Sequence, residues 1–107
     1  MPGVETLPDL EEATDTRTAR QSPYSVILHN DDFNSTIFVA TVLYKVFAYP
    51  QLKCITLMME AHKTGRAIVW TGSLEVAELK VEQIHSCGGD PSNPKATPLH
   101  ATIEPAA

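Results

Sequence analysis

The alternation of hydrophobic and polar residues changes its period along the chain, and each change predicts a new element. Residues 24–29 are rich in β-branched and aromatic side chains and run into Asn30-Asp31-Asp32, which predicts a strand that ends in a turn. From about Thr36 to Phe47, apolar residues recur every three or four positions, as in an amphipathic helix. Asn34 or Ser35 can cap the start of this helix, and Pro50 follows its end.

A second helix is predicted after Pro50, because proline suits the first turn of a helix and Gly65 suits its C-terminal cap. Its expected inner face consists of Ile55, Met58, Met59 and His62. Residues 67–70 then predict a short strand, and residues 71–73 a turn. A third helix is expected between its N-cap, Ser73, and the glycine pair at 88–89. Residues 99–104 alternate between apolar and polar, which predicts a half-buried last strand.

These elements follow the order β-α-α-β-α-β. The alternation in the last strand indicates a sheet with one face in water, which antiparallel sheets allow and parallel sheets rarely do. The sequence therefore predicts an α+β fold, in which three helices cover one face of a small, three-stranded, mostly antiparallel sheet.

The charge divides the chain into two parts. The 107 residues suit a single domain, and 43% of them are hydrophobic, which is enough to form a core. The net charge of −5 is uneven, because residues 1–22 hold five acidic and two basic residues but few large apolar ones. Such a segment cannot bury enough surface to offset its loss of conformational entropy. We therefore expect a flexible acidic arm at residues 1–22 and a nearly neutral core domain at residues 23–107.

Composition argues against several classes of function. The acidic balance disfavours nonspecific binding to nucleic acid. No stretch approaches the ~20 apolar residues of a membrane-spanning helix, and no signal segment opens the chain, so we expect a cytoplasmic protein. Cys54 and Cys87 are too few for a disulfide framework, and no paired Cys or His spacing typical of a metal site occurs. We therefore expect neither a metal nor a cofactor.

The Asn30-Asp31-Asp32 turn is the most polar segment in an otherwise apolar region. It could bind a divalent cation, act as an acid/base pair, accept hydrogen bonds from an ammonium group, or simply form a turn. His62 could be a core residue, or it could join this turn at one end of the sheet. In the second case a pocket with a polar rim would lie between them, over an apolar floor formed by Leu28, Val39, Met58 and Ala61.

Four segments resemble, in order and in spacing, the ClpS family of adaptors for the Clp protease. They are PYSVILHNDDF at 23–33, LMMEAHKTGRA at 57–67, EVAELK at 75–80 and PLHATIE at 98–104. The resemblance implies the fold described above and an adaptor without enzymatic activity. Such adaptors bind proteins through a bulky hydrophobic N-terminal residue, an N-degron. They pass these proteins to the N-domain of a Clp/Hsp100 unfoldase, ClpA or ClpC.

The resemblance also implies a role for individual residues. The α-ammonium group of the substrate would be bound by Asn30, Asp31 and His62. The first side chain of the substrate would enter an apolar pocket lined by Leu28, Asp32, Asn34, Thr36, Val39, Met58, Ala61 and Leu99. Glu75 and Lys80 match positions that contact the unfoldase, and the acidic arm would engage the pore of the unfoldase.

Several residues depart from the family pattern. Thr36 stands where the family has a methionine that excludes β-branched side chains, and Ala61 stands where valine is usual. We therefore expect a roomier pocket with an altered preference among hydrophobic N-terminal residues. The segment from Cys87 to Thr97 is rich in glycine and proline where the family continues a helix. Asp-Phe-Asn at 32–34 resembles the cyanobacterial and plastid branch, which makes the plastid stroma an alternative location.

The sequence also allows two other functions. Asp31, Asp32 and His62 could serve a small metal-dependent hydrolase, although the sequence offers no convincing third ligand or nucleophile. A ribosomal stalk-like interaction domain has a similar fold, and it would need no pocket for free amino termini.

Overall fold

The computed structural model describes residues 22–106. The arm predicted at residues 1–22 lies outside this part of the chain except for Ser22, so its flexibility stays a prediction. The elements are β1 (Tyr24–His29), α2 (Thr36–Phe47), α3 (Gln51–Thr64), β2 (Arg66–Gly72), α4 (Leu74–Ser86) and β3 (Ala101–Pro105). This order confirms the predicted sequence of strands and helices and the α+β class.

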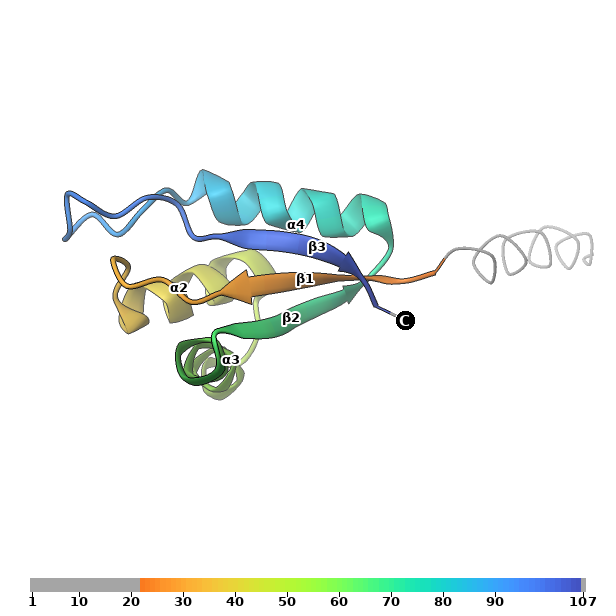
Figure 1. The fold of residues 1–107 in the computed structure, drawn as a ribbon, viewed down its shortest axis with the longest axis horizontal. Helices are drawn as coiled ribbons and strands as arrows, with labels where there is room; N and C mark the ends of the chain where they lie inside the picture. Colours follow the sequence, from red (N-terminus) through yellow and green to blue (C-terminus); the bar gives the residue numbers. More distant parts are fainter. Residues whose placement is uncertain (1–21, 107) are drawn as a thin grey trace, which may run out of the picture.

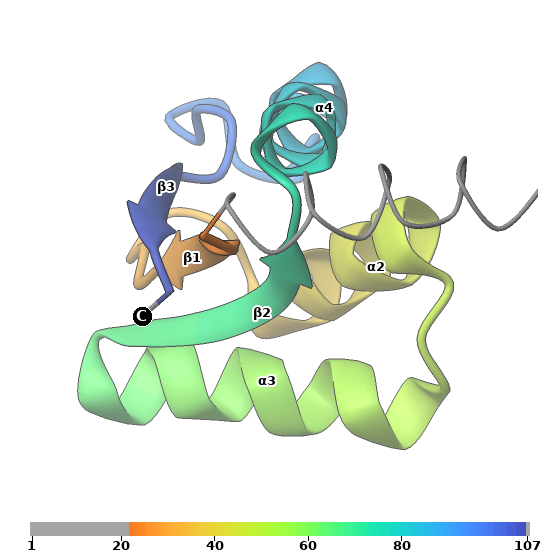
Figure 2. The same cartoon turned by 90° about the vertical axis from the view of Figure 1, so that its right-hand side faces the viewer.

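The three strands form one antiparallel sheet with β1 in the middle, in the order β2-β1-β3. The three helices surround one face of this sheet and leave the other open (Figures 1 and 2). Val26 and Leu28 of β1 point toward the helices and join the buried core with Leu43 of α2 and Ile84 of α4. Within residues 22–106, no helix combines the length and the apolar character needed to cross a bilayer.

The helix ends follow local chemistry. Ser35, rather than Asn34, caps α2, because its Oγ accepts a hydrogen bond from the Phe38 N–H at 3.1 Å. After α2, Ala48 adopts the left-handed conformation (φ 56°), and its N–H donates to the Tyr44 carbonyl. Gly65 ends α3 in the same region (φ 96°), as its lack of a Cβ allows.

The buried face of α3 differs from the prediction. Its buried residues are Cys54, Met58 and Ala61, so only Met58 is shared with the expected set. Ile55 is 38% exposed, because it faces a groove between α2 and α3 instead of the core. His62 lies on the exposed side of the helix, where its ring can reach the surface.

Two strand boundaries also differ from the prediction. β2 continues through Thr71 and Gly72, where a turn was expected, because these residues pair with Ser25 and Tyr24 at the start of β1. β3 begins at Ala101 instead of residue 99. Leu99 is instead a core residue with 1% of its surface exposed.

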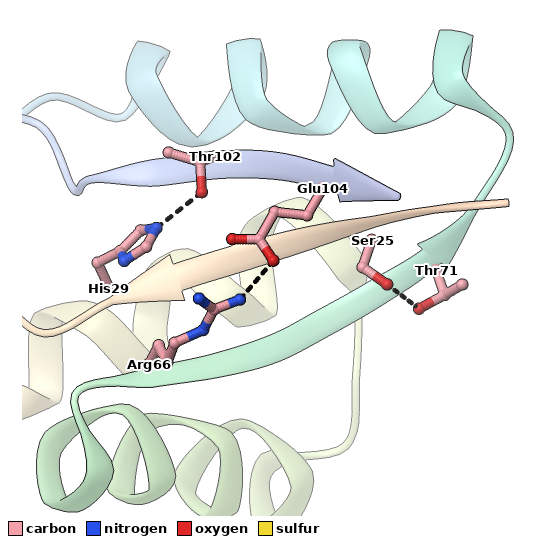
Figure 3. A network of polar contacts seen from close by, with 6 residues as sticks. All are labelled: Ser25, His29, Arg66, Thr71, Thr102 and Glu104. Atoms are coloured by element: carbon pink, nitrogen blue, oxygen red, sulfur yellow. Dashed lines mark hydrogen bonds and ion pairs between the residues drawn. The ribbon is translucent and has the colours of Figure 1, made fainter. Parts of the chain in front are cut away.

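Polar side chains cover the open face of the sheet (Figure 3). Three contacts join them: Ser25 Oγ to Thr71 Oγ1 at 2.9 Å, His29 Nε2 to Thr102 Oγ1 at 2.7 Å, and Arg66 to Glu104 at 2.6 Å. Ile27, on the middle strand between them, is only 1% exposed. Ile68, its partner on β2, is 57% exposed, so the open face is polar apart from this one apolar side chain.

The two ends of the sheet differ in what they carry. At one end, Tyr24 of β1 lies opposite Gly72 and Pro105, and the chain enters the domain there. At the other end, His29 lies opposite Arg66. The β1–α2 turn and the long loop between α4 and β3 both project from this second end (Figure 1).

Candidate functional site

A pocket of about 230 Å³ lies at the end of the sheet where β1 passes into α2. Its walls come from the end of β1, the β1–α2 turn, the start of α2 and the last turns of α3. The lining residues are Leu28, His29, Asn30, Asp31, Asp32, Asn34, Ser35, Thr36, Val39, Met58, Ala61 and His62. Every residue predicted for the ammonium group or the first side chain is among them except Leu99, which stays in the core.

Chain geometry brings the polar residues to the mouth of the pocket and the apolar residues to its floor. Leu28, Met58 and Ala61 are 1%, 8% and 3% exposed, so the floor is apolar and closed from below. The Asn30 N–H donates to the Gly65 carbonyl at 2.9 Å, which ties the β1–α2 turn to the end of α3. His62, three residues before Gly65, is thereby held near Asn30 at the exposed rim.

The Asp31 carboxylate is held in place by three donors. Its Oδ1 accepts hydrogen bonds from the N–H groups of Phe33 at 2.6 Å and Asn34 at 3.0 Å, and its Oδ2 accepts one from Asn34 Nδ2 at 2.7 Å. Burial raises the pKa of this carboxyl, but the hydrogen bonds from Phe33 and Asn34 outweigh burial and bring the pKa below its ordinary value. The pocket therefore presents a fixed negative charge at neutral pH.

Asn34 lines the pocket by position, yet its amide has no group left for a ligand. Its Nδ2 donates to Asp31 and to the Thr97 carbonyl at 2.9 Å, and its Oδ1 accepts from the Asp90 N–H at 2.7 Å. The side chain is thus a structural tie between two segments, and Asn34 is only 6% exposed.

His29 and Ser35 also line the pocket, although the sequence analysis assigned neither of them to it. Their positions next to Asn30 and Thr36 are the only signal that could have found them. The His29 ring stacks on His100 with 4.4 Å between centroids. Burial first, and then the neighbouring charges of His100 and Arg66, lower the pKa of His29 below its ordinary value.

Thr36 and Met58 form a boundary between this pocket and a second, larger cavity. The second cavity is a groove of about 590 Å³ between α2 and α3. Its lining is Thr36, Ile37, Ala40, Thr41, Tyr44, Gln51, Cys54, Ile55 and Met58. Because a threonine side chain is short, only its methyl and hydroxyl groups separate the two spaces on the α2 side.

The arrangement offers little to a metal ion. Among residues 22–106, no three His, Cys, Asp or Glu side chains come close enough to share one. Asp31 Oδ1 already accepts two hydrogen bonds and Oδ2 accepts one, which leaves Oδ2 a lone pair for one further hydrogen-bond donor. The geometry of Asp31, Asp32 and His62 therefore does not favour the hydrolase alternative. The presence of a defined pocket likewise does not favour an interaction domain that needs none.

The model of one protein family, "ATP-dependent Clp protease adaptor protein ClpS", matches residues 19–102. The chain belongs to the ClpS family. It is 41% identical to the ClpS adapter protein of Synechococcus elongatus over 103 residues, which cover 95% of this chain and 96% of that protein. It is 38% identical to the ClpS adapter protein of Vibrio atlanticus over 76 residues, covering 71% and 72% of the two chains.

A solved structure of the family has the same fold. The structure of Agrobacterium tumefaciens ClpS2 bound to L-phenylalaninamide is 34% identical in sequence and superposes with a TM-score of 0.71. The match covers 80% of this chain and 99% of that one. The resemblance of the four sequence segments to ClpS is thus confirmed.

The two residues expected to contact an unfoldase lie on α4, away from the pocket lining. Glu75 is exposed in the first turn of α4. Lys80 is half-buried: its Nζ donates to the Val46 carbonyl at 2.9 Å and lies 5.5 Å from the centroid of the Phe47 ring. Lys80 therefore caps a carbonyl near the end of α2, which would otherwise lack a donor.

Proposed function

We propose that this chain recognises proteins by a bulky hydrophobic N-terminal residue and delivers them to a Clp/Hsp100 unfoldase. The observation that carries the proposal is the pocket, in which a fixed carboxylate sits above a closed apolar floor. Asn30, Asp31 and His62 would bind the α-ammonium group at the rim. The first side chain would occupy the space between Val39, Met58 and Ala61.

The chemistry of the pocket suits a free amino terminus that carries a hydrophobic side chain. An ammonium group needs acceptors with negative charge, and a hydrogen bond to a charged group contributes about 1.5–3 kcal/mol. Burying a Leu or Phe side chain contributes a further ~1.5–3 kcal/mol. L-Phenylalaninamide, which Agrobacterium ClpS2 binds, has both a free amine and an aromatic side chain. This supports binding of the same chemical class here.

Titration with short fluorescent peptides tests the binding half of the proposal. Peptides that begin with Leu or Phe should bind, and acetylation of their α-amine should abolish binding because the amide nitrogen carries no charge. If the free and acetylated peptides bind equally, the amino-terminus assignment is wrong.

The delivery half is tested by degradation of a Leu-initiated reporter with ClpA or ClpC and their peptidase. The chain should accelerate degradation with at least one of the two unfoldases, and no acceleration with either would refute delivery.

The specificity of the pocket would depend on Thr36 and Ala61. A short threonine at the boundary with the α2–α3 groove leaves room for a side chain that is wide at its Cβ, such as Ile or Val. We expect Thr36→Met to weaken binding of Ile- and Val-initiated peptides while it preserves binding of Leu. Ala61→Val should shorten the pocket and weaken Phe more than Leu. An order of affinities that neither substitution alters would contradict this assignment.

Glu75 offers the cleaner test of the unfoldase contact. Its side chain is exposed and has no described partner among residues 22–106, so Glu75→Lys should reduce delivery and leave the fold and peptide binding intact. Lys80→Ala should also reduce delivery, but it removes a cap from α2 and should lower stability as well. Unchanged degradation with Glu75→Lys would rule Glu75 out as part of this contact.

The arm would act at a different place from the pocket. The chain enters β1 at Tyr24, at the opposite end of the sheet from Asn30 and Asp31. Deleting residues 1–22 should therefore leave peptide binding unchanged and abolish delivery. Equal degradation rates with and without these residues would refute a role for the arm.

A further inference from the structure

The loop between α4 and β3 is fastened to the turn that carries the proposed ammonium site. Two asparagine side chains make the connection. Asn34 accepts from the Asp90 N–H at 2.7 Å and donates to the Thr97 carbonyl at 2.9 Å. Asn93 Nδ2 donates to the Phe33 carbonyl at 2.8 Å. The loop and the turn are thus joined from both sides, across more than fifty residues of sequence.

Asp90 is the buried centre of this connection, with 7% of its surface exposed. Its Oδ1 accepts from the N–H and the hydroxyl of Ser92 at 2.9 and 2.7 Å, and its Oδ2 accepts from the Ser35 N–H at 3.1 Å. The bonds from Ser92, followed by those from Ser35, hold the pKa of Asp90 well below its ordinary value. Because Ser35 is the N-cap of α2, the charged carboxylate also lies beside the positive end of that helix.

The hydrogen bonds form a continuous path from the loop to Asp31. Asp90 N–H donates to Asn34 Oδ1, and Asn34 Nδ2 donates to Asp31 Oδ2 at 2.7 Å. We call these three residues the Asp31–Asn34–Asp90 network. The loop packs closely on itself, since Gly89 lies so near Ala96 that a Cβ on Gly89 would come within 2.6 Å of the Ala96 carbonyl oxygen. Three prolines also restrict its backbone.

We propose that Asn34 and Asp90 are positioning residues for the amino-terminus pocket. Asn34 fixes the plane of the Asp31 carboxylate. The backbone N–H of Asp90 holds Asn34, and the Asp90 carboxylate holds the Ser35 N–H at the start of α2, which brings Thr36 and Val39 to the pocket wall. Neither residue needs to touch the substrate, since every polar atom of the Asn34 amide is already paired within the protein. This inference rests on the proposed function, because it assigns the supports of that same site.

The chain offers a matched control for the network. Asn34→Ala removes the bonds to Asp31 and to the loop together. Asn93→Ala removes another bond between the same loop and the same turn, but this bond ends on the Phe33 carbonyl and does not reach Asp31. If fastening the loop were the only role of Asn34, the two variants would behave alike.

Two measurements then distinguish positioning from general stability. We expect Asn34→Ala and Asp90→Ala to raise the Kd of a Leu-initiated peptide roughly tenfold, and Asn93→Ala to change this Kd by less than about twofold. The pKa of Asp31, followed by carboxyl NMR, should rise in Asn34→Ala and stay unchanged in Asn93→Ala. Thermal unfolding establishes that each variant is folded at the temperature of measurement.

The possible outcomes separate this inference from the function on which it rests. If the wild type binds and all three variants lose affinity equally, or none does, the positioning role is overturned. If the wild type binds no Leu- or Phe-initiated peptide, the proposed function fails. Where Asn34→Ala does not fold, Asn34→Leu, which fills a similar volume but cannot donate to Asp31, replaces it, and an unchanged pKa of Asp31 in this variant would overturn the inference.

Discussion

Replacing Asp31 by asparagine separates the charge of this side chain from its shape. The amide oxygen of the variant can still accept from the Phe33 and Asn34 N–H groups, which now lie 2.6 and 3.0 Å from Asp31 Oδ1. The amide nitrogen would replace Oδ2 and face Asn34 Nδ2, so one donor would meet another. We expect the turn to form, with the free energy of unfolding lowered by about 1–2 kcal/mol.

The effect on binding should be larger than the effect on stability. Losing a charge-assisted hydrogen bond to the ammonium group costs about 1.5–3 kcal/mol, which corresponds to a roughly 10- to 150-fold increase in Kd. Calorimetric titration of a Leu-initiated peptide at low and high salt measures both the loss and its origin. The affinity of the wild type should fall with added salt, and that of Asp31→Asn should fall less.

The exposed Glu82 on α4 provides the control for net charge. Glu82→Gln changes the charge of the molecule by the same amount at a distance from the pocket, and it should bind like the wild type. The reasoning is refuted if Asp31→Asn binds within twofold of the wild type while it remains folded. It is equally refuted if Glu82→Gln loses as much affinity, because the effect would then be one of overall charge.

Three further predictions concern stability. Ala48→Gly should raise the free energy of unfolding by about 0.5–1 kcal/mol and Tm by a few degrees, because Ala48 occupies the left-handed region at φ 56°. The control Ala40→Gly, inside α2, should lower both quantities. A loss of stability in Ala48→Gly would contradict the assignment. Gly72→Ala should destabilise the fold by about 1–3 kcal/mol, because a Cβ at this position overlaps the Trp70 ring; an unchanged melting curve and unchanged Trp70 fluorescence would show that the ring moves freely. The pKa of His29 lies below its ordinary value of 6.5 in the folded chain, so as the pH falls the unfolded chain takes up the proton first, and stability should drop below pH 6.5. His29→Gln should flatten this part of a Tm–pH profile. A profile of the variant that runs parallel to that of the wild type would exclude His29 as the cause.

The sequence was sufficient for the order of elements because each has its own period and its own boundary residue. Ser73 and Gly65 mark helix ends through contacts within a few residues, and the structure has the ends where these residues predict them. The inner face of α3 was harder to predict. Ile55 is apolar but faces the α2–α3 groove, and hydrophobicity alone does not distinguish a groove wall from a core.

The pocket was predictable only in part. Spacing puts Leu28 and Asn30 at the end of a strand and Met58 and His62 on one helix, but only the resemblance to ClpS implied that the two pairs share a pocket, as they do in the structure. The role of Asp90 depends on a contact with Asn34, which lies 56 residues away, and no periodic pattern encodes it. The bond from Lys80 to the Val46 carbonyl is of the same kind, since it depends on how α4 packs against α2.

The central place of β1 has a mechanical consequence. This strand enters the domain at Tyr24, is bonded on both sides, and ends at the turn that carries Asp31. A pull on the chain ahead of Tyr24 would run along β1 and load both hydrogen-bond ladders in shear, because their bonds lie perpendicular to the strand. Tension applied at one end of the molecule and a peptide bound at the proposed site at the other would therefore act on the same strand. A force that slides β1 would displace the turn that carries Asp31.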